Sequence, residues 1–298
     1  MAEYPIRFLD PDILASISGM ELRARAVVEG FLSGLHRSPY KGFSVEFAEY
    51  RQYTPGDDPR HIDWKVYART DRFYVKEFEE ETNLSCHILL DLSRSMTYAS
   101  KNVTKLEYAS YLAASLAFLM SRQRDAIGLV TFDHDIREHI PAKLRAGHLH
   151  TILKTLEKLQ PGDRTDIARP LHLIADFLRK KGMVILISDL LDRAEKIIES
   201  IQHFRFRGHE MLIFHILDKA ELEFPFHATT RFIGLEGEGQ VLTIPQNVRK
   251  EYLARLQAHI QEIRTACGVH QVDYTLLNTA QPLDFALQEY LAARIGKV

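Results

Sequence analysis

The stretch CHILLDLSRS, residues 86–95, carries an apolar run directly into an acid and two serines. The run CHILL has the composition of a buried β-strand, and Asp91, Ser93 and Ser95 follow it at alternate positions. Three oxygen-bearing side chains in this spacing are typical either of a turn that caps a helix or of a site that holds a ligand. Other parts of the sequence are needed to choose between these two interpretations.

Downstream of this stretch, short apolar runs alternate with segments of helical periodicity. The predicted strands cover residues 84–92, 126–133, 135–142, 183–190, 209–218 and 269–278. The predicted helices cover residues 105–125, 148–160, 166–182, 192–208, 247–268 and 282–296. A β-hairpin is expected at 230–244, with Gly237 and Gly239 in its turn. Strands that are apolar throughout and alternate with helices predict an α/β fold with a doubly wound, mostly parallel sheet.

The first 83 residues have a different pattern, which predicts a small α+β segment. A helix is expected at 11–34 and strands at 41–53 and 72–81, with a turn and a short helix between the two strands. No low-complexity linker separates this segment from the rest of the chain. We therefore expect two domains, 1–83 and 84–298, that pack against each other.

The composition favours some classes of function over others. Apolar residues make up 46% of the 298 residues and charged residues 26%, as in ordinary globular proteins. The net charge of −2 makes nucleic acid a poor candidate for a partner. The N-terminus has no signal-peptide pattern, no apolar stretch reaches the length of a membrane span, and the two cysteines have no metal-type spacing. A cytoplasmic protein is expected.

Two further polar positions follow predicted strands or precede predicted helices in the same way as Asp91. Asp189 ends the apolar strand VILISD, and Thr165 lies in the loop GDRTD before a helix. Because the carboxyl ends of parallel strands form one edge of a sheet, these side chains are expected to meet there. Their oxygens suit a hard divalent cation, Mg²⁺ or Mn²⁺, and do not suit zinc. Helix capping remains the alternative interpretation for each position taken alone.

The order DLSRS, then Thr165, then Asp189 resembles the metal-ion-dependent adhesion site of von Willebrand factor A domains. The resemblance covers residues 84 to about 295 and implies a von Willebrand A-like fold. It implies that Asp91, Ser93, Ser95, Thr165 and Asp189 are the metal ligands. In that family a carboxylate of a partner protein completes the coordination of the metal, so the resemblance also implies an acidic partner surface.

The segment YRQYTPGDDPRHIDWKVYARTDRFYVKEFEEE, residues 50–81, resembles the signature of a bacterial and archaeal family of unknown function, number fifty-eight in the usual naming. Members of that family combine the signature with a von Willebrand A-like domain, and their genes often neighbour those of MoxR-type AAA+ ATPases. The resemblance implies such an ATPase as partner. The signature itself is expected to be structural, with Asp57 or Asp58 capping a helix and Trp64 as a packing anchor, although a docking role stays open.

Two classes of function remain. The first is a non-enzymatic, metal-dependent interaction module that works as an adaptor with the ATPase. The second is a magnesium-dependent hydrolase or phosphatase that uses the same residues. An aspartyl phosphatase would need a second acid at the position of Ser93 as proton donor, and a serine hydroxyl is a poor donor at neutral pH. No phosphate-binding loop or serine-hydrolase elbow is present either, so we expect the adaptor class and no enzymatic activity.

Overall fold

The computed structural model describes residues 11–35, 50–52, 74–76, 85–162, 166–235, 237 and 239–295. The chain divides into two compact units, residues 1–34 with 84–298, and residues 35–83. The division differs from the expected boundary because the N-terminal helices belong to the larger unit. Of the expected features, Thr165, Trp64 and the segment 53–73 lie outside the described residues.

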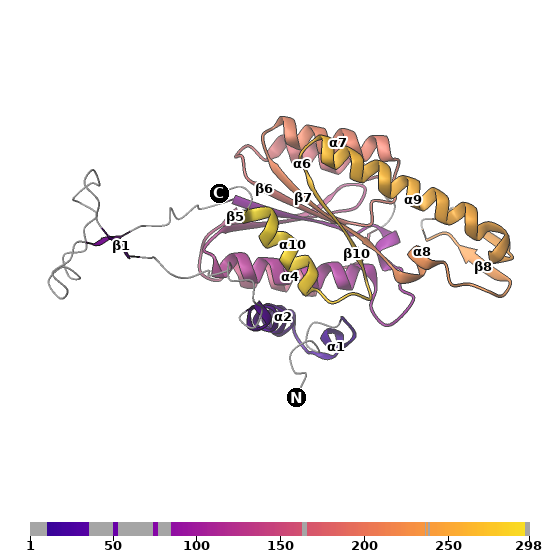
Figure 1. The fold of residues 1–298 in the computed structure, drawn as a ribbon, viewed down its shortest axis with the longest axis horizontal. Helices are drawn as coiled ribbons and strands as arrows, with labels where there is room; N and C mark the ends of the chain where they lie inside the picture. Colours follow the sequence, from indigo (N-terminus) through magenta and orange to yellow (C-terminus); the bar gives the residue numbers. More distant parts are fainter. Residues whose placement is uncertain are drawn as a thin grey trace. The chain divides into compact units, whose positions relative to one another are not determined.

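A six-stranded sheet forms the centre of the larger unit (Figure 1). Its strands are β3 (Ser85–Asp91), β4 (Ala126–Phe132), β5 (Ile136–Lys143), β6 (Met183–Ser188), β7 (Glu210–Leu217) and β10 (Asp273–Asn278). The order across the sheet is β10-β7-β6-β3-β4-β5. All neighbours are parallel except β5, which pairs antiparallel with β4. The predicted doubly wound, mostly parallel sheet is confirmed.

Helices cover both faces of the sheet (Figure 1). One face carries α4 (Lys105–Arg122), α5 (His148–Glu157) and α10 (Asp284–Ile295), and the other carries α6 (Ala168–Phe177), α7 (Ala194–Phe206) and α9 (Pro245–Val269). The second interface buries an apolar cluster that includes Leu89 and Leu186 of the sheet and Phe204 of α7. The central strands are buried on both faces, which explains why they are apolar throughout.

Two N-terminal helices, α1 (Pro11–Ser16) and α2 (Met20–Leu35), replace the single helix expected at 11–34. The break spans residues 17–19, and Gly19, whose φ of +84° is a left-handed conformation open to glycine, directly precedes α2. The guanidinium of Arg23 in α2 lies 5.0 Å from the ring centroid of Tyr111 in α4. This contact places α2 against α4, whose residues are almost all buried.

Some elements differ from the expected ranges. The short helix α8 (Lys219–Glu223) and the 3-10 helix η3 (Arg94–Thr97) were not predicted, because each spans about one turn. Helix α6 ends at Phe177, five residues before the predicted end at 182. In the other unit, β1 (Tyr50–Gln52) and β2 (Tyr74–Lys76) pair antiparallel, as their expected strand character indicated.

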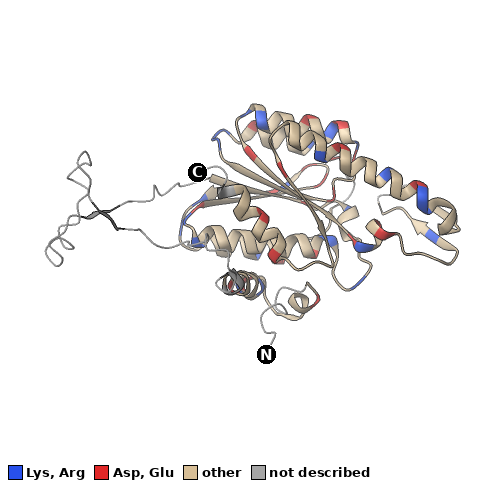
Figure 2. Ribbon diagram, viewed as in Figure 1, with Lys and Arg blue, Asp and Glu red and all other residues tan. Residues whose placement is uncertain are grey.

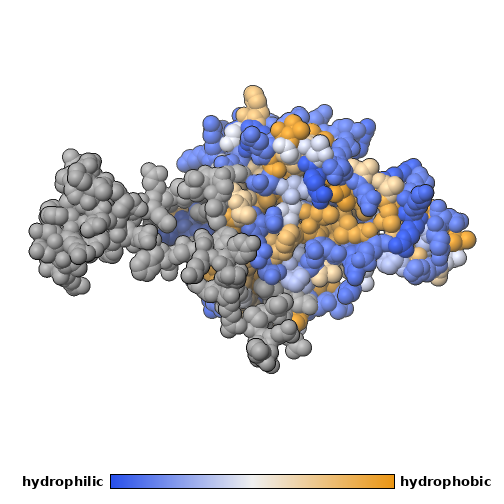
Figure 3. Space-filling model, in the orientation of Figure 1, coloured by the Kyte–Doolittle hydropathy of each residue, from blue (hydrophilic) through white to orange (hydrophobic). Residues whose placement is uncertain are grey.

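The predicted hairpin is present as β8 (Thr230–Ile233) and β9 (Gln240–Thr243). Its root packs through an aromatic cluster, in which Phe224 stacks on Phe232 with ring centroids 5.5 Å apart. Several apolar side chains of the hairpin are exposed, Val241 and Leu242 among them. Figure 3 shows apolar surface beside polar surface in the region where Figure 1 places β8. Basic and acidic residues both occur along α7 and α9 (Figure 2). Among the described residues, no helix combines the length and the apolar character needed to cross a bilayer.

Candidate metal centre

The candidate site lies at the carboxyl ends of β3 and β6, which are adjacent central strands of the sheet. The chain leaves β3 toward β4 on one side and later returns to β6 on the other, so this is the point where the strand order reverses. Ligands in doubly wound sheets bind at such a point. Asp91 ends β3, and Asp189 directly follows β6.

Asp91 is buried and organises the loop that follows β3. Its Oδ1 accepts a hydrogen bond of 2.7 Å from the amide of Ser93. Its Oδ2 accepts one of 2.6 Å from the hydroxyl of Ser188 at the end of β6. The Oγ atoms of Ser93 and Ser95 lie 3.0 Å apart. The structure therefore brings Asp91, Ser93 and Ser95 together as expected, with Ser95 partly exposed at the surface of the cluster.

Asp189 is fully buried and carries an ion pair that the sequence pattern did not suggest. Its Oδ2 lies 2.8 Å from Nζ of Lys105, the first residue of α4. The same ammonium lies 2.8 Å from Oε1 of Glu221 in α8. Lys105 is itself fully buried, so one ammonium pairs with two acids that come from distant parts of the chain.

The carboxyl of Asp91 is held in an environment that opposes its ionisation. Burial, together with the negative charge of Asp189, raises the pKa of Asp91 to about 7. The hydrogen bonds from Ser188 and Ser93 act in the opposite direction and only partly offset this rise. Burial alone would lower the pKa of Lys105, but Asp189 and Glu221 outweigh it and raise that pKa. The ammonium is therefore a permanent charge, whereas none of the described residues places a cationic group directly against the Asp91 carboxylate.

Thr165 lies outside the described residues, but both flanks of its loop lie at this edge of the sheet. The amide of Gly162 donates a 2.7 Å hydrogen bond to the carbonyl of Leu92, directly after Asp91. The amide of Ile167 donates to Oδ2 of Asp192, three residues after Asp189, at 3.2 Å.

The described side chains at this site have the oxygen chemistry that a hard divalent cation prefers, but they include fewer carboxylates than a dedicated metal site. Asp91, Ser93 and Ser95 supply only oxygen, the ligand type that Mg²⁺ and Mn²⁺ prefer. Within the described ranges, no three His, Cys, Asp or Glu side chains come together as a metal-binding group. A cation here would therefore rely on hydroxyls and water as well as on carboxylate, as Mg²⁺ usually does in proteins.

Three residues of the site were missed from the sequence: Lys105, Ser188 and Glu221. The sequence pattern could have identified Lys105, because this residue shares a helical face with Tyr108 and Leu112, which are both fully buried. A lysine in an apolar stripe predicts a buried ion pair, although not its partners. Ser188 directly precedes a candidate ligand, and its proximity to Asp91 follows only from the pairing of β3 with β6.

Comparison with known proteins identifies the family. Residues 49–262 match the family described as "Protein of unknown function DUF58". The chain belongs to this family. The uncharacterized protein Rv1480 of Mycobacterium tuberculosis is 29% identical to this DUF58 protein over 219 residues, which cover 72% of this chain and 68% of Rv1480.

A solved structure supports the fold assignment. The conserved hypothetical protein BatB from Bacteroides thetaiotaomicron superposes with a TM-score of 0.51 at 18% identity, covering 71% of this chain and 99% of BatB. The fold of the DUF58 protein is von Willebrand A-like, as the resemblance implied. Proximal thread matrix protein 1 from the mussel byssus, whose adhesion-site motif holds zinc, gives a TM-score of 0.44 at 14% identity, with 71% of this chain and 48% of that chain covered. The zinc is a property of the mussel protein.

Proposed function

We propose that this DUF58 protein is a non-enzymatic interaction module that binds an acidic side chain of a partner protein through a divalent cation, Mg²⁺ or Mn²⁺. The supporting observation is the pair of buried acids, Asp91 and Asp189, at the ends of adjacent central strands beside the hydroxyls of Ser93 and Ser95. Asp91, Ser93 and Ser95 would hold the cation, with Thr165 as the further ligand that the family resemblance implies. When bound, the cation supplies a positive charge that a partner carboxylate can approach.

The residues at this edge of the sheet favour binding over turnover. Among the described residues, Asp91 accepts from the hydroxyl of Ser188 and the amide of Ser93, and Lys105 is paired with two carboxylates. General acid–base catalysis needs a positioned group that gives or takes a proton during the reaction. A hydroxyl at neutral pH and a lysine with a raised pKa do this poorly. A hydrolase that uses the same residues is therefore a less favoured hypothesis than a binding module.

The partner that the family resemblance implies is a MoxR-type AAA+ ATPase, and the protein would act as its adaptor in the cytoplasm when other complexes are assembled or activated. The acidic surface bound at the cation would belong to the ATPase or to its client.

A capture experiment tests this proposal. The purified protein is expected to retain a MoxR-type ATPase or its client in Mg²⁺ and to release it in EDTA, and Asp91→Ala is expected to abolish retention. Asp91→Ala is a cleaner test than Asp189→Ala, because loss of Asp189 also removes a partner of Lys105. Metal-dependent hydrolysis of a phosphate ester that is lost in Asp91→Asn would instead make the protein an enzyme.

A further inference from the structure

The buried ammonium of Lys105 is the main feature of this region that the proposed function leaves unexplained. Its side chain is fully buried and lies 2.8 Å from both Asp189 and Glu221. Removing a lysine and two acids from water costs free energy, and the pairing offsets only part of that cost. Buried ion pairs are thus weak evidence for stability, and their positions often serve another purpose.

We propose that Lys105 is a built-in counter-ion that sets how strongly this site binds a divalent cation. The inference rests on the proposed function and adds a specificity-determining residue to it. Asp91, Asp189 and Glu221 are linked electrostatically, and Lys105 is the ammonium among them. With all three acids ionised, two negative charges remain, which one divalent cation neutralises.

The geometry also indicates different roles for Asp91 and Asp189, the acids at the ends of β3 and β6. Oδ2 of Asp189 is taken by the ammonium of Lys105. Within the described part of the chain, the oxygens of Asp91 accept from neutral donors, the Ser93 amide and the Ser188 hydroxyl. Asp91, with Ser93 and Ser95, therefore offers oxygens to a cation. Asp189 contributes mainly its charge, and Lys105 reduces the effect of that charge.

Lys105 is held in place by backbone structure as well as by its ion pairs. Helix α4 begins with a capping box, in which the Thr104 hydroxyl accepts from the amide of Glu107 while the Glu107 carboxylate accepts from the amide of Thr104. The amide of Lys105 donates a 3.0 Å hydrogen bond to the carbonyl of Tyr98, which follows η3. The backbone that carries the ammonium is thus fixed by hydrogen bonds that involve no cation.

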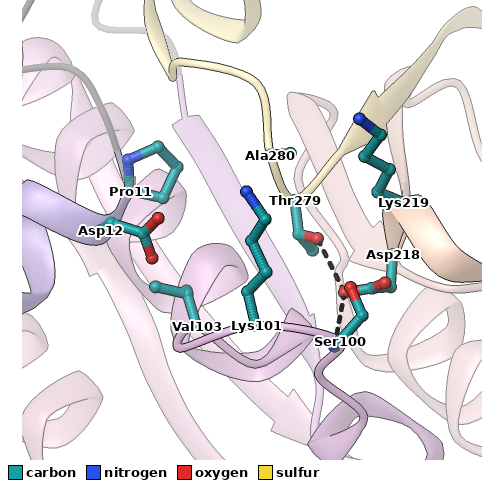
Figure 4. A pocket seen from close by; sticks show the side chains of 9 residues that line it. All are labelled: Pro11, Asp12, Ser100, Lys101, Val103, Asp218, Lys219, Thr279 and Ala280. Carbon is teal, nitrogen blue, oxygen red and sulfur yellow. Dashed lines mark hydrogen bonds between the residues drawn. The ribbon is translucent and has the colours of Figure 1, made fainter.

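Three variants test the proposal in the full chain. Lys105→Met removes the charge and keeps the length of the side chain. Glu221→Gln removes one acid and keeps an acceptor for the amide of Asp218, which donates to Glu221 at 2.7 Å. Lys101→Met is the matched control. Lys101 is exposed and lines a small pocket with Thr279 and Asp218 (Figure 4). Its replacement by methionine changes the net charge of the protein by the same amount as Lys105→Met.

The readouts are Mg²⁺ and Mn²⁺ titration by calorimetry and the melting temperature in EDTA and in Mg²⁺. Lys105→Met is expected to bind either cation on the order of tenfold more tightly than wild type, because the charge at the site becomes more negative. Its melting temperature should fall in EDTA and recover more in Mg²⁺ than that of wild type. Glu221→Gln is expected to bind the cations more weakly, and Lys101→Met as wild type does.

If Lys105→Met and Glu221→Gln both bind the cations with wild-type affinity, the proposal is overturned and Lys105 is a structural residue. The same conclusion follows if Lys101→Met changes the cation affinity as much as Lys105→Met does. Absence of cation binding in every variant would overturn it as well. If Lys105→Met does not fold in EDTA, the opposite shift expected of Glu221→Gln still decides the question. Cation binding that follows these expectations without cation-dependent capture of a partner would refute the proposed function and leave the counter-ion role intact.

Discussion

At the scale of single residues, this protein buries ionisable groups in its sheet and along one edge of it. Asp91, Asp189, Lys105, His87 and His215 are all buried. A buried acid or histidine is neutral more often than an exposed one, because burial disfavours the charged form. Two predictions follow from the directions in which burial moves the pKa values of Asp91 and His87.

Asp91→Asn is expected to raise stability in the absence of a cation. Burial and Asp189 raise the pKa of Asp91 to about 7, so at pH 8 the folded protein carries an unfavourable charge that the variant lacks. Asparagine keeps an acceptor for the Ser93 amide. The free energy of unfolding in urea with EDTA should rise by about 1–2 kcal/mol. Glu199→Gln, on the exposed side of α7, should leave it unchanged. A large loss of stability would show that Asp91 acts as a structural cap.

His87→Gln is expected to reduce the amount by which the free energy of unfolding falls as the pH is lowered. Burial, with His209 and His139 adding to it, lowers the pKa of His87 from 6.5 to about 4. As the pH falls through this window, the unfolded chain takes up the proton first, so wild type loses stability by up to about 3 kcal/mol. Urea unfolding between pH 7 and about pH 4.5 measures the slope. The exposed His227→Gln is the control, and equal slopes in the two variants would refute the prediction.

At the scale of elements, the loop after α5 packs closely against the residues that follow β3 and β4. Gly162 donates to the carbonyl of Leu92 and packs against the side chain of Asp133. A Cβ on Gly162 would lie 2.2 Å from Oδ2 of Asp133, which is too close for any real contact. The absence of a side chain at this position is what lets the loop approach β3.

Gly162→Ala is therefore expected to lower the free energy of unfolding by about 1–3 kcal/mol, since the loop or Asp133 must move. Gly268→Ala in α9 is the matched control, because nothing lies within 4 Å of its added Cβ. Alanine is the better helix former, so this variant should be neutral or more stable by about 0.5 kcal/mol. Denaturant unfolding of both variants measures the contrast, and similar effects in both would show that the close approach does not matter.

At the scale of the whole molecule, α2 completes the cover over α4. Ala24, Val27, Val28 and Phe31 of α2 are buried, and Arg23 stacks on Tyr111. The N-terminal helices thus belong to the same compact unit as the sheet, although about 50 residues separate them from β3 in the chain.

A chain beginning at Glu81 is expected to aggregate, because loss of α2 exposes the apolar surface of α4. Val28→Asp in the full chain should reproduce part of this effect, with a loss of about 3 kcal/mol or more for a buried, unpaired charge. Leu22→Asp is the control, since Leu22 is 53% exposed on the same helix. Size-exclusion chromatography and thermal melting measure both effects. A stable, monomeric chain from Glu81 would show that α2 is dispensable.

The sequence by itself determined the alternation of strands and helices, the parallel sheet and the oxygen-rich loop after β3. Each depends on local periodicity, or on the rule that parallel strands end at one edge. The tertiary structure alone decided which groups neutralise one another there. Lys105 meets Asp189 and Glu221 across separations of 84 and 116 residues. No local pattern records such a pairing, because it arises only when α4, β6 and α8 pack together and bring three charges into a largely buried position.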